Sequence, residues 1–247
     1  MNYNYQIIIE YIGKDFVGWQ IQKNGNSIQY KIEKAISKVL KSKIKLIGSG
    51  RTDAGVNALG QSANFYFHAK INDYKKFLSS VNFFLKKCTI SIIEIKSKNL
   101  KFHARHSAKK RRYEYLILNR IAKPSIDQDR VWFVKKKLDF IKMKKAIIFF
   151  LGTHNFSAFR ASSCSAKSPI RTINQASITK KNDKIFINFV SKSFLQKQVR
   201  SMVGCLKYVG ENKWSPNKIR QLIKSKKRDQ CAPPAPPEGL FLKKIYY

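Results

Sequence analysis

Acidic residues are scarce in this chain of 247 residues, where 14 aspartates and glutamates stand against 50 lysines and arginines. A formal net charge of +36 at pH 7 makes a folded chain repel itself unless a polyanion binds it. Aromatic residues make up 13% of the chain and hydrophobic residues 43%, so it is no disordered basic tail. The composition therefore favours a folded protein whose partner is nucleic acid.

Cysteines and long hydrophobic runs are also rare. The four cysteines lie far apart, with no C-x-x-C pair and no histidine at metal-ligand spacing: Cys88, Cys164, Cys205 and Cys231. Free thiols in a reducing compartment are therefore expected, and a bound metal is not. No apolar stretch is long enough to span a membrane, and the chain starts in a strand-like pattern rather than a signal peptide. We expect a soluble, cytoplasmic protein with no membrane partner.

Hydrophobic periodicity predicts that strands and helices alternate. The first half is predicted to contain a strand from Tyr5 to Tyr11, a helix capped by Ser27, a helix at 73–86 and a strand at 89–96. Lysines on the polar face of the first helix fit a solvated face, and they also fit RNA contact. The second half is predicted to contain a strand at 112–118, a helix at 139–151, a hairpin at 173–179 and 185–190, a helix at 195–209, a helix after Ser215-Pro216 and a strand at 239–242. Two α/β halves with mixed sheets fit this order, although the halves share no clear sequence identity.

One carboxylate, Asp53, stands in a glycine-rich run from Gly48 to Gly60, between two strand-like segments. Glycines permit backbone conformations closed to other residues and allow a ligand to approach the main chain. Arg51 is near enough to keep Asp53 ionised or to hold a phosphate beside it. The functional interpretation is an active-site aspartate in a pocket for an anionic ligand. The alternative is a glycine-rich turn in which Asp53 caps its own loop.

Six blocks occur in order along nearly the whole chain and together resemble the bacterial tRNA pseudouridine synthase A family. The blocks are Glu10-Tyr11-x4-Phe16-x-Gly18-Trp19-Gln20, Ser49-Gly50-Arg51-Thr52-Asp53-Ala54-Gly55-Val56, Phe102-His103-Ala104-Arg105, Arg112-Tyr113-x-Tyr115, Gln198-Val199-Arg200-x-Met202-Val203-Gly204 and Glu238-Gly239-Leu240. The resemblance implies an α+β fold in which two α/β halves, 1–105 and 106–247, have mixed, mostly antiparallel sheets joined into one continuous central sheet with helices packed on it. It also implies a homodimer that isomerises uridines 38, 39 and 40 in the tRNA anticodon stem-loop without a metal or cofactor.

The resemblance also assigns roles to residues. Asp53 matches the catalytic aspartate, expected to act as nucleophile, and Arg200 matches the charge partner of that aspartate. Tyr113 matches a tyrosine that stacks on a base taken out of the RNA helix, although Tyr115 points to the same face and the two registers are easily confused. Leu240 matches an apolar wall of the pocket, and burial in an ordinary strand core explains it nearly as well. Arg51 is expected to contact RNA phosphate or to help displace the target nucleotide.

Three features depart from the usual family pattern. Asn57 stands where a histidine is common, His106 stands where an aromatic residue is common, and the block Phe194-Leu195-Gln196-Lys197-Gln198 replaces commoner histidines. None of these departures removes the aspartate, arginine or tyrosine. A non-catalytic RNA-binding or RNA-folding protein is the alternative function, but RNA binding alone does not require the set Arg51, Asp53, Tyr113 and Arg200. A metal-dependent RNA hydrolase is disfavoured because few acidic residues lie near Asp53.

Overall fold

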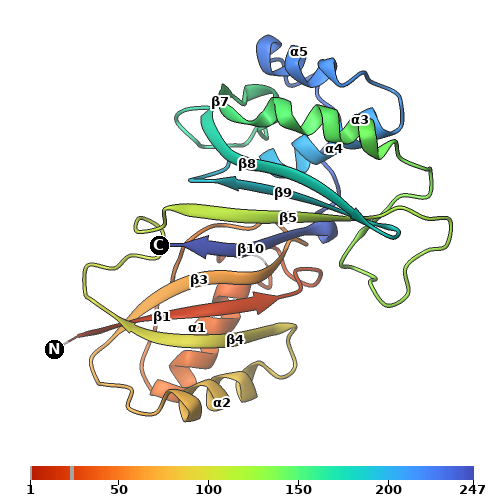
Figure 1. The fold of residues 1–247 in the computed structure, drawn as a ribbon. Helices are drawn as coiled ribbons and strands as arrows, with labels where there is room; N and C mark the ends of the chain where they lie inside the picture. Colours follow the sequence, from red (N-terminus) through yellow and green to blue (C-terminus); the bar gives the residue numbers. More distant parts are fainter. Residues whose placement is uncertain (1, 23–24) are drawn as a thin grey trace. The chain divides into compact units, whose positions relative to one another are not determined.

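The computed structural model describes residues 2–22 and 25–247. Within those residues the chain forms ten strands and five α-helices and divides into two compact units (Figure 1). Unit 1 comprises Met1–Lys109 and Leu242–Tyr247, and unit 2 comprises Lys110–Phe241. In the division expected from the sequence, the residues after Phe241 belong with the second half; in the structure they belong to unit 1.

Unit 1 is an antiparallel sheet with two helices packed on it. Strand β1 (Tyr3–Tyr11) lies between β3 (Asn57–Phe67) and β4 (Ile90–Lys98) and runs antiparallel to both. The short strand β2 (Ile47–Gly48) pairs with β3, and β10 (Leu240–Tyr246), which ends in this unit, neighbours β3 as well. Helix α1 (Ile28–Leu40) packs against α2 (Tyr74–Leu85), and α2 packs against β4. These pairings confirm the strands and helices that the sequence predicted for the first half.

Side-chain caps explain where the two helices of unit 1 begin. The Ser27 hydroxyl accepts a hydrogen bond from the amide of Tyr30, and the Asp73 carboxylate accepts one from the amide of Lys76. Such caps satisfy amides that have no partner within the helix. The buried residues of α1 form one stripe, which faces the core: Ile28, Ile32, Ala35 and Ile36.

Unit 2 contains a second antiparallel sheet, in the order β5 (Lys110–Leu118), β9 (Lys184–Ser191), β8 (Ile170–Lys181) and β7 (Gly152–Asn155). The short strand β6 (Trp132–Phe133) adds to β5 in parallel. Three helices belong to this unit: α3 (Phe140–Ile147), α4 (Gln198–Gly210) and α5 (Asn217–Ser225). Short 3-10 helices occupy Ile148–Phe150, Ser157–Phe159 and Pro237–Gly239. The predicted α+β class, with mixed, mostly antiparallel sheets and packed helices, is confirmed.

Several boundaries in unit 2 differ from the sequence prediction. The helix expected over 139–151 ends at Ile147, and a 3-10 turn then leads to β7 at Gly152, whose positive φ of 94° suits glycine. The helix expected from residue 195 begins at Gln198, because Lys197 has a left-handed φ of 60°. Strands β2 and β6 are two residues long, too short to give an alternating pattern.

Candidate active site

Asp53 lies in the loop that joins β2 to β3. The two strands pair in antiparallel register, Ile47 with Asn64 and Gly48 with Ala63, so the loop between them is short and both its ends are fixed. Asp53 is half-buried, whereas Arg51 beside it is exposed. The carbonyl of Asp53 accepts a hydrogen bond of 3.2 Å from the amide of Val56, which closes a turn directly after the aspartate. The predicted strand–loop–strand arrangement around Asp53 is thus confirmed.

The residue before the aspartate, Thr52, is held through both its backbone and its side chain. Its carbonyl accepts a hydrogen bond of 3.1 Å from the amide of Trp19, and its hydroxyl shares a hydrogen bond of 2.8 Å with the hydroxyl of Tyr11. Tyr11 and Trp19 are themselves 3% and 2% exposed, so both anchors are part of the core. The first block, which contains Tyr11 and Trp19, therefore serves to fix the backbone on one side of Asp53.

Close approach of the backbone explains the glycine of that first block. Gly18 has a φ of 110°, which side chains rarely permit, and a Cβ there would lie 2.7 Å from the carbonyl oxygen of Thr52. Any other residue at position 18 would push the segment away from the aspartate loop. The glycine therefore brings this segment, and with it Trp19, within hydrogen-bonding reach of Thr52.

The departure at Asn57 has a structural explanation. Its side chain is fully buried, and its Oδ1 accepts a hydrogen bond of 2.8 Å from the amide of Gly13. The opposite end of the loop is tied in a similar way, since the Gln61 side chain donates a 2.8 Å hydrogen bond to the carbonyl of Gly50. Asn57 thus takes part in fixing the loop from the side of β3.

Tyr113 and Tyr115 lie two residues apart on β5 and are both buried, at 8% and 0% exposure. The hydroxyl of Tyr115 donates a 2.7 Å hydrogen bond to the carbonyl of Pro236, and burial raises the pKa of this tyrosine well above its usual range. Tyr113 meets the ring of Phe194 edge to face, with 5.2 Å between ring centroids. Tyr115 is therefore a core residue anchored to the chain near Pro236, which leaves Tyr113 as the better candidate for stacking.

Arg200 stands on the first turn of α4 and is half-buried. Its Nε donates a 2.7 Å hydrogen bond to the carbonyl of Ala235, and the amide of Ala235 donates a 2.9 Å hydrogen bond to the carbonyl of Arg200. These reciprocal bonds join α4 to the proline-rich segment that precedes Leu240. Leu240 itself is 5% exposed and is the first residue of β10.

The predicted site residues come from both units. Arg51 and Asp53 belong to unit 1, and Tyr113, Arg200 and Leu240 belong to unit 2. Within unit 2, Tyr115 and Arg200 are both tied to the segment before Leu240, through Pro236 and Ala235. Sequence reasoning missed Thr52 and Tyr11 as the supports of the aspartate loop, although both lie inside blocks that it singled out.

Two basic clusters, Lys109–Arg112 and Lys224–Arg228, are partly structural. Arg112 donates from Nε and Nη2 to Oδ1 of Asn188 on the neighbouring strand, and Arg228 donates to the carbonyl of Ala158. The lysines of the two clusters are exposed: Lys109, Lys110, Lys224, Lys226 and Lys227. Exposed lysines remain available for phosphate contact, whereas Arg112 and Arg228 already have structural contacts.

His103 and His106 have structural surroundings. The Nδ1 atom of His103 accepts hydrogen bonds from the amides of Arg105 and His106, at 3.2 and 3.3 Å. Burial, followed by the nearby His106, lowers the pKa of His103 below its ordinary value. A neutral His103 that caps a turn through Nδ1 fits these contacts.

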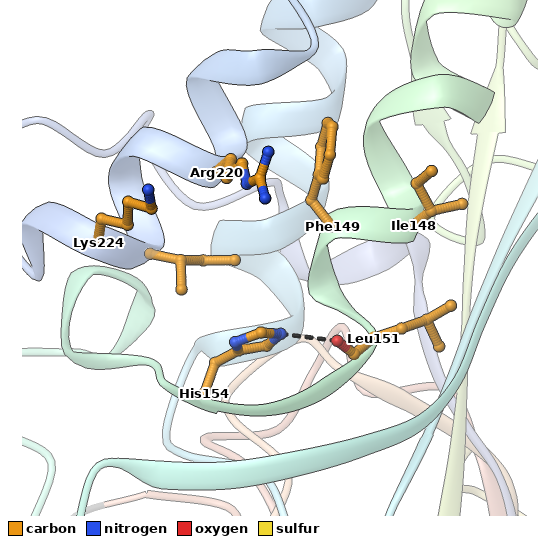
Figure 2. A pocket seen from close by; sticks show the side chains of 7 residues that line it. Ile148, Phe149, Leu151, His154, Arg220 and Lys224 are labelled. Atoms are coloured by element: carbon orange, nitrogen blue, oxygen red, sulfur yellow. Dashed lines mark hydrogen bonds between the residues drawn. The ribbon is translucent and has the colours of Figure 1, made fainter.

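A pocket of about 360 Å³ lies elsewhere in unit 2, and Figure 2 shows side chains that line it. The lining residues are Ile148, Phe149, Leu151, His154, Arg220, Ile223 and Lys224. His154 points across it toward Leu151, whose carbonyl lies 2.6 Å from Nε2 (Figure 2). None of the residues predicted for catalysis or substrate binding lines this pocket.

The described residues contain neither a cluster of metal-binding side chains nor a membrane-spanning helix. Over 2–22 and 25–247, no three histidine, cysteine or acidic side chains gather in a way that could hold a metal ion. No helix in that same part of the chain is long and apolar enough to cross a membrane.

Comparison with known proteins places the six blocks in context. Residues 7–107 and 146–247 match the sequence model of a family described as tRNA pseudouridine synthase. The tRNA pseudouridine synthase A of Pelagibacter ubique is 57% identical over 245 residues, which cover 99% of this chain and 100% of that protein. The proteins of the same name from Parvibaculum lavamentivorans and Ehrlichia ruminantium (strain Welgevonden) are 40% and 42% identical, over 98% of this chain and 98% and 99% of their own lengths. A solved structure of a Cbf5-Nop10-Gar1 complex matches with 10% identity and a TM-score of 0.32, over 82% of this chain and 53% of that one, which is too weak to support an argument.

Proposed function

The chain belongs to the tRNA pseudouridine synthase family, and we propose that it isomerises uridine to pseudouridine at positions 38, 39 and 40 of the tRNA anticodon stem-loop. The observation that carries the proposal is the aspartate loop. Asp53 is half-buried. On one side of it, Thr52 is anchored through its backbone and its side chain, and on the other side the amide of Val56 closes a turn. A carboxylate on a loop fixed in this way is suited to act on one bond of a bound nucleotide.

The reaction breaks the N1–C1′ glycosidic bond, turns the base in place and joins C5 to C1′. We assign Asp53 the role of catalytic nucleophile, which requires its carboxylate form. Arg200 is the proposed charge partner, because a guanidinium stabilises the ionised form of a nearby carboxylate. The hydrogen bond from Arg200 Nε to Ala235 supports this role, since it fixes the direction of the guanidinium.

The target uridine has to leave the RNA stack before Asp53 can reach it, and the exposed base then needs a flat surface. Tyr113 is the proposed stacking residue. Its edge-to-face contact with Phe194 holds the ring in a fixed orientation, and the anchored hydroxyl of Tyr115 favours Tyr113 over its neighbour. Leu240 is proposed as an apolar wall of the pocket, which is consistent with its 5% exposure.

Arg51 is proposed to contact RNA phosphate, because it is exposed and lies two positions before Asp53. The net charge of +36 supports tRNA as the partner, since neutralising phosphates with lysine and arginine supplies most of the affinity for nucleic acid. We further propose that the protein acts as a homodimer in the cytoplasm.

Asp53→Asn tests the assignment, because the amide has nearly the same shape as the carboxylate but is neither nucleophilic nor basic. With tRNA labelled by tritium at C5 of uridine, joining C5 to C1′ releases the label to solvent. We expect Asp53→Asn to lose release by at least about a thousandfold while tRNA binding stays within a few-fold. The matched control is Asp15→Asn, an exposed aspartate of the same unit, which should behave as wild type.

Release by Asp53→Asn near the wild-type rate would refute the role of Asp53. The positions are tested separately with transcripts in which uridine 38, 39 or 40 is replaced by cytidine, and with one transcript in which all three are replaced. If the transcript lacking all three uridines were still modified at the wild-type rate, the substrate assignment would be wrong, whatever the result for Asp53.

A further inference from the structure

Two of the four cysteines, distant in the sequence, have their sulfur atoms close together. The Sγ atoms of Cys205 and Cys231 are 3.4 Å apart, although 26 positions separate the residues. Cys205 is fully buried on α4, and Cys231 is half-buried in the segment that follows α5. Both residues belong to unit 2, and both are free thiols. The sequence spacing gave no sign of this pair.

The two thiols have opposite chemical character. The hydrogen bond from Cys205, together with the positive charge and hydrogen bond of Arg228, lowers the pKa of Cys231 below its ordinary value. Burial raises the pKa of Cys205, so that thiol keeps its proton and can donate it to its neighbour. A partly exposed thiol with a lowered pKa beside a buried partner is the arrangement in which a peroxide reacts first with one sulfur and the second sulfur then resolves the product.

The backbone around the two sulfurs is already fixed in this arrangement. The reciprocal hydrogen bonds between Arg200 and Ala235 join α4 to the segment after Cys231. In the same contact between α4 and this segment, Gly204 lies so close to Pro233 that a Cβ at position 204 would overlap the carbonyl oxygen of Pro233. The sulfurs therefore meet because two backbone segments are packed together, and they need only a short movement to bond.

We propose that Cys205 and Cys231 form a redox modification site that a hydroperoxide converts to an intramolecular disulfide. The Cys231 thiolate attacks the terminal peroxide oxygen, which breaks the O–O bond and gives a sulfenic acid and, for hydrogen peroxide, water after protonation. The Cys205 sulfur then attacks the sulfenic sulfur, losing its proton as the S–O bond breaks and a second water leaves. Overall two thiols are oxidised by two electrons, and one hydrogen peroxide is reduced to two waters.

The crosslink would act on the elements that carry two candidate site residues. It joins α4, five positions beyond Arg200, to the start of the segment that runs through Ala235 to Leu240. Closing a loop between residues 26 positions apart restricts the unfolded chain, so the oxidised protein should unfold at a higher temperature, by about 5 to 10 °C. This inference does not depend on the proposed function, because its readouts are the state of the thiols and the thermal midpoint.

The experiment treats the full chain with a small excess of hydrogen peroxide, blocks remaining thiols with an alkylating reagent, and measures intact mass and peptide linkage by mass spectrometry. We expect two alkylated cysteines instead of four, a peptide linking Cys205 to Cys231, and return of all four thiols after a dithiol reductant. Cys231→Ser should abolish the crosslink and the rise in midpoint, whereas the control Cys88→Ser should keep both. Cys205→Ser should leave Cys231 as a sulfenic acid that a sulfenate-specific reagent traps.

Three results would overturn the proposal: four thiols still alkylated after treatment, oxidation that falls on Cys88 or Cys164 instead, or the same mass change in Cys231→Ser. The linkage measurement uses the unsubstituted chain, so it remains decisive even if a substitution at the buried Cys205 prevents folding.

Discussion

The hydrogen bond between the hydroxyls of Tyr11 and Thr52 gives a direct test of how the loop that carries Asp53 is positioned. The bond is buried, 2.8 Å long and joins β1 to the residue before Asp53. Thr52→Val and Tyr11→Phe each remove one hydroxyl with little change of shape. A neutral buried hydrogen bond contributes about 1 kcal/mol to the free energy of unfolding, so each variant should lose at least about this much.

The double variant should reveal the coupling, because the bond can be lost only once. In urea unfolding, the sum of the two single losses should exceed the loss of the double variant by about 1 kcal/mol. The fall in catalytic activity should be larger than the loss of folded protein alone would cause. A displacement of Asp53 by about 1 Å can cost roughly a hundredfold in rate, so we expect kcat to fall by about ten- to a hundredfold with KM little changed.

Thr89→Val is the matched control, since its hydroxyl donates a 2.9 Å hydrogen bond to the carbonyl of Ile12 at an exposed position of the same unit. This variant should keep wild-type tritium release. Purely additive losses of stability would show that the two hydroxyls do not interact. Full activity in Thr52→Val would show that the bond does not position the aspartate.

Two further predictions concern α4 and its end. Gly204→Ala should lower the free energy of unfolding by about 2 to 3 kcal/mol, because the added methyl overlaps the backbone carbonyl of Pro233; an unchanged urea midpoint would contradict this packing. Burial alone would raise the pKa of Glu211, but its ion pairs of 2.7 Å with Lys207 and 3.2 Å with Lys213 lower it below the ordinary 4.5. The stability that the ionised Glu211 contributes is therefore present above about pH 4.5 and is lost as pH falls below that value. In urea unfolding, the difference in free energy of unfolding between wild type and Glu211→Gln should shrink as pH falls below about 4.5 and should stay constant at higher pH.

Local pattern was enough to predict most of the fold. The stripe of isoleucines in α1 and the side-chain caps at Ser27 and Asp73 are properties of neighbouring residues, so a single sequence displays them. The helix expected over 139–151 was too long because a change from helix to 3-10 turn within an apolar run leaves no mark in the pattern. The return of β10 to unit 1 depends on pairing with β3, across most of the chain, and no local signal records it.

The candidate site likewise has features that the local sequence predicts and features that depend on long-range contacts. Asp53 stood out because one acid among glycines is unusual in a basic chain, and its loop could be placed between strands from the alternation that follows it. The supports of that loop could not be foreseen, since the bonds from Tyr11 and Trp19 to Thr52 span more than thirty positions. The pairing of Asp53 with Arg200 is likewise a long-range prediction, made from the family resemblance.

The contacts of Arg200 bear on why an arginine and not a lysine stands there. Arg200 can be interpreted as a structural arginine or as the proposed charge partner of the aspartate, and the hydrogen bond from its Nε to the carbonyl of Ala235 by itself fits the structural role. A guanidinium, however, carries five N–H donors in a rigid plane, of which Nε supplies one. The bond to Ala235 thus orients the four donors on the terminal nitrogens and keeps the charge in a set direction. A lysine carries its three N–H donors on one nitrogen at the end of a flexible stem, so a hydrogen bond to the carbonyl would not fix the direction of the remaining donors. The structural contact is therefore what makes Arg200 suitable as a charge partner, rather than an alternative to that role.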